Sequence, residues 1–264
     1  MSKTKIEWAD YSWNPVVGCT PVSEGCEHCY AKRIYERFHP HESFSQVELR
    51  QDALYAPLYW KKPGKIFVNS MGDLFHPDVP DSFIYKVFST MDKVTNQTFL
   101  ILTKRHERMW EFCNKFKPAF GAGNSTNTGN DFIHSWPLPN VWLGVTVENL
   151  KEAGKRIPLL LETPAAVRFI SVEPMLSWID IRCFLYPEIR WGGNRPSLDW
   201  IICGGETGPG ARWMKPEWAR ALRDQCLAAG VPFYMKQMTK KELIPDDLLV
   251  RQFPEVKNEQ NLKI

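Results

Sequence analysis

Two kinds of hydrophobic pattern alternate along the chain. Short apolar runs rich in β-branched and aromatic residues are typical of buried strands, whereas apolar residues that recur every three or four positions are typical of amphipathic helices. The runs predict seven strands: Trp13–Val17, Ile66–Asn69, Phe99–Leu102, Val141–Val147, Val167–Val172, Trp200–Cys203 and Val231–Met235.

The segments between these strands carry the helical spacing, at residues 30–38, 83–91, 109–116 and 218–226. The last of these helices has clear ends, because Pro216 stands near its start and Gly230 and Pro232 follow its final turn. Strands that alternate with helices pair in parallel through right-handed crossovers. The sequence therefore predicts an α/β fold, a partial or full (β/α) barrel of about six to seven parallel strands.

The barrel is expected to occupy residues 1–264 as a single domain. Two stretches interrupt the rhythm, around 117–139 and 186–198, and their content of Gly, Ser, Asn and Pro predicts loop insertions. Barrel enzymes place their chemistry at the carboxyl ends of the strands. The polar residues that follow each predicted strand are therefore the candidates for a functional site.

Composition narrows the class of protein only a little. With 44% hydrophobic and 24% charged residues, the chain is neither disordered nor a small disulfide scaffold. No apolar run approaches the roughly 18 residues that a membrane span needs, and no apolar stretch follows the N-terminus, so a cytoplasmic location without membrane partners is expected. A net charge of +3 does not indicate nucleic-acid binding. The 11 Trp, 8 Tyr and 15 Phe residues either fill a core or stack on bases.

The seven cysteines fall into two groups. Three of them, Cys19, Cys26 and Cys29, lie within eleven residues, in a turn-rich loop between the first strand and the first helix. Thiolates hold iron–sulfur clusters or zinc, and the two-residue spacing of the last pair allows both sulfurs to reach one centre. The remaining cysteines lie in apolar surroundings, where a thiol usually serves as a small buried side chain; these are Cys113, Cys183, Cys203 and Cys226.

The number of thiolates distinguishes two metal sites. A four-iron cluster with three protein thiolates leaves one iron open for a substrate or cofactor. A structural zinc ion needs a fourth protein ligand, for which His39, His41 or His76 is available. Both interpretations stay open at this point.

Several motifs accompany the cysteine loop: Trp13-Asn14-Pro15, Cys29-Tyr30-Ala31, Met71 to Phe75, Leu102 to Arg105, Ser171 to Pro174 and Gly204 to Arg212. With the strand and helix rhythm, they resemble the radical S-adenosylmethionine (SAM) superfamily and, more specifically, an uncharacterised family of phage and bacterial proteins with a three-cysteine motif. The superfamily usually places three residues and then two between its cysteines. Here six residues separate Cys19 from Cys26, and two separate Cys26 from Cys29.

The resemblance implies a [4Fe-4S] cluster on Cys19, Cys26 and Cys29, whose open iron is chelated by the amine and carboxylate of SAM. Reductive cleavage of SAM then gives a 5′-deoxyadenosyl radical that abstracts hydrogen from the substrate. A reductant such as flavodoxin or ferredoxin is implied as a partner, in the host cytoplasm if the protein is phage-encoded. The family context also suggests a nucleotide or DNA substrate, namely a modified thymine or other nucleobase in phage DNA that is rearranged or isomerised.

The resemblance further implies a SAM site along the strand ends. His28 and Tyr30 flank the last thiol, where adenine binds. A carboxylate suits the SAM ammonium and glycine permits close approach, although Asp73 is also suited to capping a turn. Likewise, Glu148 and Asn149 either bind ribose or open the next helix. The candidate cofactor-binding residues are His28, Tyr30, Ser70, Gly72, Asp73, Thr146, Glu148, Asn149, Ser171, Gly204, Gly205 and Glu206.

Lys104 and Glu173 are the candidate catalytic residues. Glu173 ends an otherwise apolar strand and precedes Pro174, a position that is difficult to explain as an ordinary solvated charge. Lys104 belongs to a group of basic residues at predicted strand ends that are expected to line one mouth of the barrel and to suit an anionic substrate or the SAM carboxylate. The others in this group are Arg105, Arg212 and Lys236, the last followed by Gln237.

Two alternative functions accompany this hypothesis. One is a zinc-stabilised nucleic-acid-binding module without catalysis, in which the aromatic residues stack on bases. It predicts no 5′-deoxyadenosine and a steep salt dependence of binding. The other is a barrel that binds a cluster only to sense oxidation, in which substitution of Asp73 or Glu173 has no effect on function.

Overall fold

The computed structural model describes residues 2–115, 133–186 and 196–255. Most of the two predicted loop insertions, 117–132 and 187–195, lies outside these residues. Their described remainder, at 133–139 and 196–198, contains neither a helix nor a strand.

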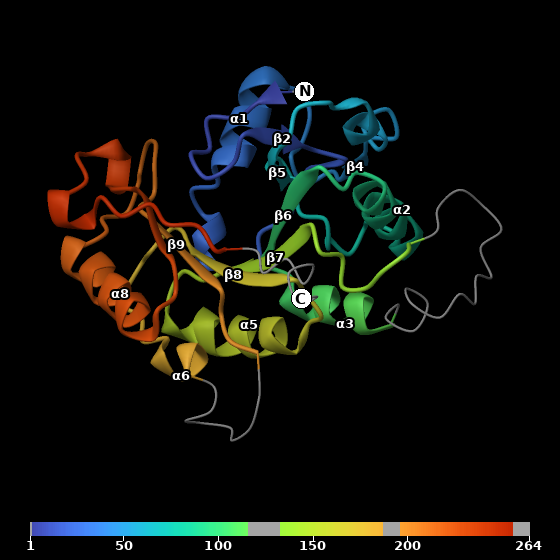
Figure 1. The fold of residues 1–264 in the computed structure, drawn as a ribbon. Helices are drawn as coiled ribbons and strands as arrows, with labels where there is room; N and C mark the ends of the chain where they lie inside the picture. The colour runs from blue at the N-terminus through green and yellow to red at the C-terminus, as the bar shows by residue number, and fades with distance from the viewer. Residues whose placement is uncertain (1, 116–132, 187–195, 256–264) are drawn as a thin grey trace, which may run out of the picture.

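Seven parallel strands form one sheet that curls into a half-barrel (Figure 1). The short strand β1 (Ser2–Lys3) is added antiparallel at one edge, and the outermost strands β1 and β10 do not pair with each other. The predicted α/β class is therefore confirmed in its partial-barrel form. In order across the sheet, the parallel strands are β2 (Tyr11–Trp13), β5 (Gly64–Val68), β6 (Gln97–Thr103), β7 (Val141–Thr146), β8 (Val167–Val172), β9 (Trp200–Gly204) and β10 (Phe233–Gln237).

Helices connect successive strands, and α3, α5 and α8 lie along one face of the sheet (Figure 1). Of α5, the sequence indicated only the start, where Glu148 and Asn149 were candidates to open a helix. Its buried Ala153, Ile157 and Leu160 nevertheless form a stripe at helical spacing. The helices are α1 (Tyr30–Phe38), α2 (Asp81–Asp92), α3 (His106–Lys115), α5 (Leu150–Glu162), α6 (Arg182–Leu185) and α8 (Pro216–Ala229), and the short 3₁₀ helices are η1 (Glu24–Cys26), η2 (Ala56–Tyr59), η3 (Thr239–Lys241) and η4 (Asp246–Leu248).

The predicted strands other than Val167–Val172 differ from the observed strands at their ends, and two of these differences have a clear cause. The expected strand over 13–17 is divided, because Pro15 has no N–H for a ladder; beyond it, β3 (Val16–Val17) pairs antiparallel with β4 (Glu48–Leu49). The expected strand over 231–235 begins instead at Phe233. Val231 belongs to the C-terminal cap of α8, because its N–H donates to the Cys226 carbonyl. Gly230, which has a φ of 66°, makes the turn between them.

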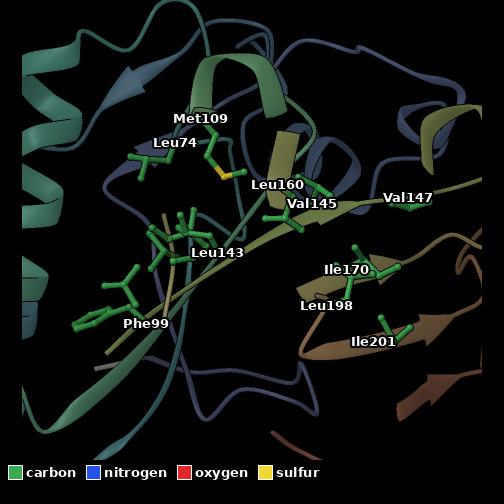
Figure 2. Packing of buried hydrophobic residues seen from close by; sticks show 14 of the residues in the cluster. Leu74, Phe99, Met109, Leu143, Val145, Val147, Leu160, Ile170, Leu198 and Ile201 are labelled. Carbon is green, nitrogen blue, oxygen red and sulfur yellow. The ribbon is translucent and has the colours of Figure 1, made fainter. Parts of the chain in front are cut away.

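The larger hydrophobic core lies between the sheet and its helices. Alternate residues of neighbouring strands contribute to it, and Figure 2 shows Phe99, Leu143 and Ile170 among them. Met109 of α3 and Leu160 of α5 belong to the same cluster. This packing fixes the helices on the sheet and so fixes the strand ends that carry the candidate residues.

A second, mainly aromatic cluster, which we call the aromatic floor, packs on the other face of the sheet. Trp200 is fully buried at its centre, where its ring contacts those of Trp8, Trp142 and Tyr234 at centroid distances of 5.9–6.3 Å. These tryptophans therefore fill a core, as one of the two interpretations of the aromatic content expects. Among the described helices, none is long and apolar enough to cross a membrane. The aromatic floor consists of Trp8, Phe67, Leu100, Trp142, Val167, Phe169, Trp200, Ile202 and Tyr234.

Candidate functional site

A cavity of about 180 Å³ opens where the strands end, as expected for chemistry carried on a barrel. Its wall contains residues that follow β3, β5, β6, β8 and β9, together with the last two residues of β10. Trp8 and Phe67 of the aromatic floor also contact it. Of the sequence-predicted site residues, only Glu148, Asn149 and Gly204 are outside this wall. The lining includes Cys19, Cys26, His28, Cys29, Tyr30, Ser70, Gly72, Asp73, Lys104, Thr146, Ser171, Glu173, Gly205 and Glu206.

Three structural elements bring the clustered cysteines to this cavity. Cys19 follows β3, Cys26 ends η1, and Cys29 immediately precedes α1. The loop turns tightly, since the Cys26 N–H donates to Ser23 and the Cys29 N–H to Cys26 at 2.9 and 3.3 Å. All three thiols are free and partly exposed, so they are available to a ligand in the cavity.

The other cysteines have the structural role expected from the sequence. Cys113, Cys203 and Cys226 are fully buried, and Cys183 packs against the larger core. Burial raises the pKa of Cys226 to about 12, and it raises that of Cys113 still further. The three fully buried thiols therefore remain protonated and unreactive.

Arg105 joins the first cysteine to the strand ends. One guanidinium nitrogen, Nη1, donates to Cys19 Sγ at 3.3 Å and to Asp73 Oδ2 at 3.2 Å. The other, Nη2, donates to the carbonyl and the hydroxyl of Thr20 at 2.9 and 3.0 Å. Burial and the Asp73 carboxylate raise the pKa of the Cys19 thiol, and Arg105 opposes them. The sequence predicted Arg105 only as part of a basic lining and gave no sign of its sulfur contact.

Asp73 is fully engaged within the protein. Its carboxylate accepts from the Thr103 hydroxyl at 2.7 and 2.9 Å, from the Phe75 N–H at 3.0 Å and from the Lys104 N–H at 3.2 Å, in addition to Arg105. The bond from Phe75 is the turn cap that the sequence offered as an alternative to a cofactor role. In this arrangement, Asp73 primarily orients Arg105 and the end of β6.

Glu148 and Asn149 contact the cysteine loop and do not line the cavity. The Ser23 hydroxyl donates to Glu148 Oε1 at 2.7 Å, and the Asn149 amide donates to the Glu24 carboxylate. Asn149 Oδ1 also accepts from the Glu152 N–H at 2.9 Å, which caps α5. The helix-opening alternative therefore describes Asn149, and both residues support the loop that carries the thiols.

Close packing against Glu148 makes Gly25 sensitive to substitution. A Cβ atom at Gly25 would lie 2.3 Å from Glu148 Cγ, so Gly25→Ala must displace either the loop or the fully buried carboxylate. We expect this variant to retain less than half of the wild-type iron after reconstitution, measured by iron analysis.

Gly154→Ala is the control for this substitution, because nothing lies within 4 Å of its Cβ position inside α5. It should keep full iron content and gain about 0.5–1 kcal/mol in unfolding free energy. Wild-type iron content in Gly25→Ala would show that the loop does not depend on this packing.

Arg212 links the glycine-rich loop to the cysteine loop. It donates to both carboxylate oxygens of Glu206, at 2.7 Å from Nη2 and 3.1 Å from Nε, and also to Glu27 and to the Glu24 carbonyl. Burial acts to raise the pKa of Glu206, but the hydrogen bonds from Arg212 outweigh it and leave that pKa lowered. Glu206 is therefore an anion held at the cavity wall.

Glu173 lies at the rim with two partners from β10. Lys236 Nζ is 2.5 Å and Gln237 Nε2 is 3.2 Å from Glu173 Oε1. Gly204 provides space beneath this carboxylate, because a Cβ there would lie 3.3 Å from its carboxyl carbon. The structure therefore places the candidate catalytic Glu173 in the cavity wall and adds Lys236 as its partner, whereas Gly204 acts by leaving room.

The expected basic lining is made of ion pairs. Each of its four cations lies within 4 Å of a carboxylate, although Lys104 shares Glu148 with Arg156, which is closer at 2.8 Å. The pairs are Lys104 with Glu148 at 3.8 Å, Arg105 with Asp73 at 3.2 Å, Lys236 with Glu173 at 2.5 Å and Arg212 with Glu206 at 2.7 Å.

The remaining predicted residues complete the wall. The Tyr30 hydroxyl donates to the Ser70 carbonyl at 2.7 Å, which ties the start of α1 to the end of β5. Thr146 and Ser171 are in register on neighbouring strands. Among the described residues, Ser171 Oγ and Asn69 Nδ2 are buried in this wall without a hydrogen-bond partner. The sequence pattern placed Asn69 at the end of a predicted strand but did not identify it as a site residue. A polar residue at a strand end was a signal that could have identified it.

The side chains at the cavity suit the two kinds of metal site to different degrees. Among the residues that the structure describes, no three His, Cys, Asp or Glu side chains are arranged to hold one metal ion. A zinc ion needs four donors around one point, but none of the proposed fourth ligands His39, His41 and His76 lines the cavity. His76 is bound to Thr20 at 2.8 Å, and His39 stacks on Tyr35. In a four-iron cluster each thiolate binds a different iron, so three thiols around a shared cavity, beside unpartnered polar atoms, fit that group.

The fold and the site together define a class: an α/β half-barrel with a three-thiol cavity at the carboxyl ends of its strands. The model of the DUF5131 family, described as a protein of unknown function, matches residues 3–258, and the chain belongs to this family. No curated protein and no solved structure matches the chain.

Proposed function

We propose that the protein is a radical SAM enzyme that reductively cleaves SAM at a [4Fe-4S] cluster and abstracts hydrogen from a substrate. The observation that carries this proposal is the gathering of Cys19, Cys26 and Cys29 at a single cavity formed by the strand ends of a parallel half-barrel. Three thiols leave one iron without a protein ligand, which is the position that SAM requires. The half-barrel supports the proposal as a compatible fold.

The three cysteines would hold the cluster in this proposal. When bound, the cluster and SAM supply the 5′-deoxyadenosyl radical, which is the reactive species. The chain itself orients the ligands: Arg212 fixes Glu206 beside the cysteine loop, and the buried Ser171 Oγ offers a hydrogen bond. The aromatic floor closes the base of the cavity and helps to exclude water, which protects a radical from side reactions.

Glu173 and Lys236 are suited to hold a proton at the rim. Lys236 Nζ donates to Glu173 Oε1 at 2.5 Å, so the two groups lie together in the cavity wall. A substrate that enters the cavity meets this pair, and either group can then exchange a proton with it. Lys104 is a second candidate for this work, and its longer 3.8 Å contact with Glu148 leaves it less constrained.

We propose a modified nucleobase as the substrate, on the basis of the resemblance to phage proteins. The ion pairs refine this proposal. A phosphate inside the cavity would have to displace a carboxylate from one of the four matched cations. An uncharged base avoids that cost, so the base rather than the backbone phosphate should enter the cavity.

The proposal is tested by anaerobic reconstitution of the full-length protein with iron and sulfide, followed by addition of SAM and dithionite. We expect about four irons per chain and the formation of 5′-deoxyadenosine, measured by liquid chromatography. Stoichiometric zinc with no 5′-deoxyadenosine would refute the enzyme. A cluster that forms without SAM cleavage would instead favour an oxidation sensor.

A further inference from the structure

Arg105 is the charged side chain in closest documented contact with the clustered thiols. Its Nη1 atom is 3.3 Å from Cys19 Sγ, and its side chain is only 9% exposed. The guanidinium has five N–H groups, of which three donate to Asp73 and to the two oxygens of Thr20, so a further N–H on Nη1 remains for the sulfur. The sulfur is therefore an additional acceptor.

The guanidinium is held in place from two sides. Thr20, which follows Cys19 directly, accepts from Nη2, and Asp73 accepts from Nη1. Asp73 is itself locked by Thr103 and by the backbone N–H groups of Phe75 and Lys104. Because the carboxylate cannot rotate freely, the N–H group that faces the sulfur is fixed in position.

We propose that Arg105 is a positioning residue that raises the reduction potential of the cluster, through its N–H bond to Cys19 Sγ and its charge, and that Asp73 sets the size of this effect. The inference rests on the proposed function, because it requires a cluster on the three cysteines. One-electron reduction, with the electron supplied by the external reductant, adds one negative charge to the cluster. Hydrogen bonds to its sulfurs and nearby positive charge stabilise that reduced form.

Asp73 acts in the opposite direction. Its carboxylate lies 3.2 Å from the Arg105 nitrogen that contacts sulfur, so it partly cancels the positive charge at the cluster. The other cations near this point have other carboxylates as partners: Arg212 faces Glu206, and Lys104 shares Glu148 with Arg156. The Arg105–Asp73 pair is therefore the adjustable charge beside Cys19, and its two members are expected to shift the potential with opposite signs.

The test measures the midpoint potential of the reconstituted cluster, without SAM, by dithionite titration followed by EPR. Arg105→Gln should shift the potential to a more negative value, because it removes the charge and leaves Asp73 uncompensated. Arg105→Lys, which keeps the charge, should shift it less. Asp73→Asn should shift it to a more positive value, because Thr20 still holds Arg105.

Arg33→Gln is the matched control. Arg33 lies on α1 in the turn that follows Cys29, and its guanidinium is exposed and donates to the Thr207 carbonyl at 3.2 Å. This variant removes one positive charge near the cysteine loop, and it should leave the potential close to that of the wild type. Circular dichroism and iron content confirm folding and loading of every variant.

The outcomes separate the two hypotheses. A wild-type protein that assembles no iron–sulfur cluster refutes the proposed function itself. A loaded cluster whose potential is the same in Arg105→Gln as in the wild type or in Arg33→Gln overturns the role of Arg105, and so do shifts of Arg105→Gln and Asp73→Asn in the same direction. If Arg105→Gln loses its cluster, the role of Arg105 is tested with Arg105→Lys and Asp73→Asn instead. Shifts of the midpoint potential in opposite directions would support it, and shifts in the same direction would overturn it.

Discussion

Cys26→Ala will bind less than one tenth of the wild-type iron after anaerobic reconstitution and will form no detectable 5′-deoxyadenosine. Cys26 ends η1 inside the cysteine loop and lines the cavity together with Cys19 and Cys29. Loss of one of three thiolates leaves two irons of a cluster without protein ligands, which such clusters rarely tolerate. Iron analysis, the visible absorption spectrum and product chromatography measure the effect.

Cys183→Ala is the matched control for this prediction. Cys183 is also a free, partly buried thiol, but it lies within α6, packs against the larger core and does not line the cavity. It should keep the wild-type iron content and activity. Equal iron loss in both variants would show that the clustered thiols are not the ligands, and an unchanged Cys26→Ala would remove the basis of the proposed function.

The sequence was sufficient to predict the class of fold and most of the cavity wall. Parallel strand ends meet at one edge of a sheet, so residues such as Ser171 and Glu173, chosen because they end an apolar run, were brought together by topology alone. The same logic placed the cysteine loop correctly. Buried residues recur every second position in a strand and every 3.6 positions in a helix, so the spacing of apolar residues indicates where each strand ends.

Contacts between side chains could not be predicted from the spacing of apolar residues. Glu148 and Asn149 follow β7 as predicted, yet they turn toward Ser23 and Glu24 instead of the cavity. For Glu148 the direction depends on Arg156 of α5, whose Nη1 donates to its carboxylate, and for Asn149 it depends on the cap that this residue provides to the same helix. Likewise, the pairing of each strand-end cation with a carboxylate depends on which loops face each other in space.

The second large effect concerns Arg156 and Glu148. Both side chains are at most 2% exposed, and Arg156 Nη1 is 2.8 Å from Glu148 Oε2 and 2.7 Å from the Thr146 carbonyl. We expect Arg156→Met to lower the unfolding free energy by about 3–5 kcal/mol, because it leaves the Glu148 carboxylate buried without its principal partner. Chemical denaturation followed by circular dichroism measures the loss.

A double substitution distinguishes two causes of the lost stability: the unpaired Glu148 charge and the loss of packing around Arg156. If the buried Glu148 charge is responsible, Glu148→Leu combined with Arg156→Met should recover more than half of the stability lost by Arg156→Met alone. The Glu148 carboxylate is then absent, and Glu152, which also pairs with Arg156, keeps Lys155 as a partner at 3.1 Å. The double variant still lacks the acceptor for the Ser23 hydroxyl, so the cysteine loop loses this support and iron loading should stay low even though stability returns. Additive losses in the double variant would show instead that packing governs. Recovered iron loading together with recovered stability would mean that Glu148 acts on the site only through the fold.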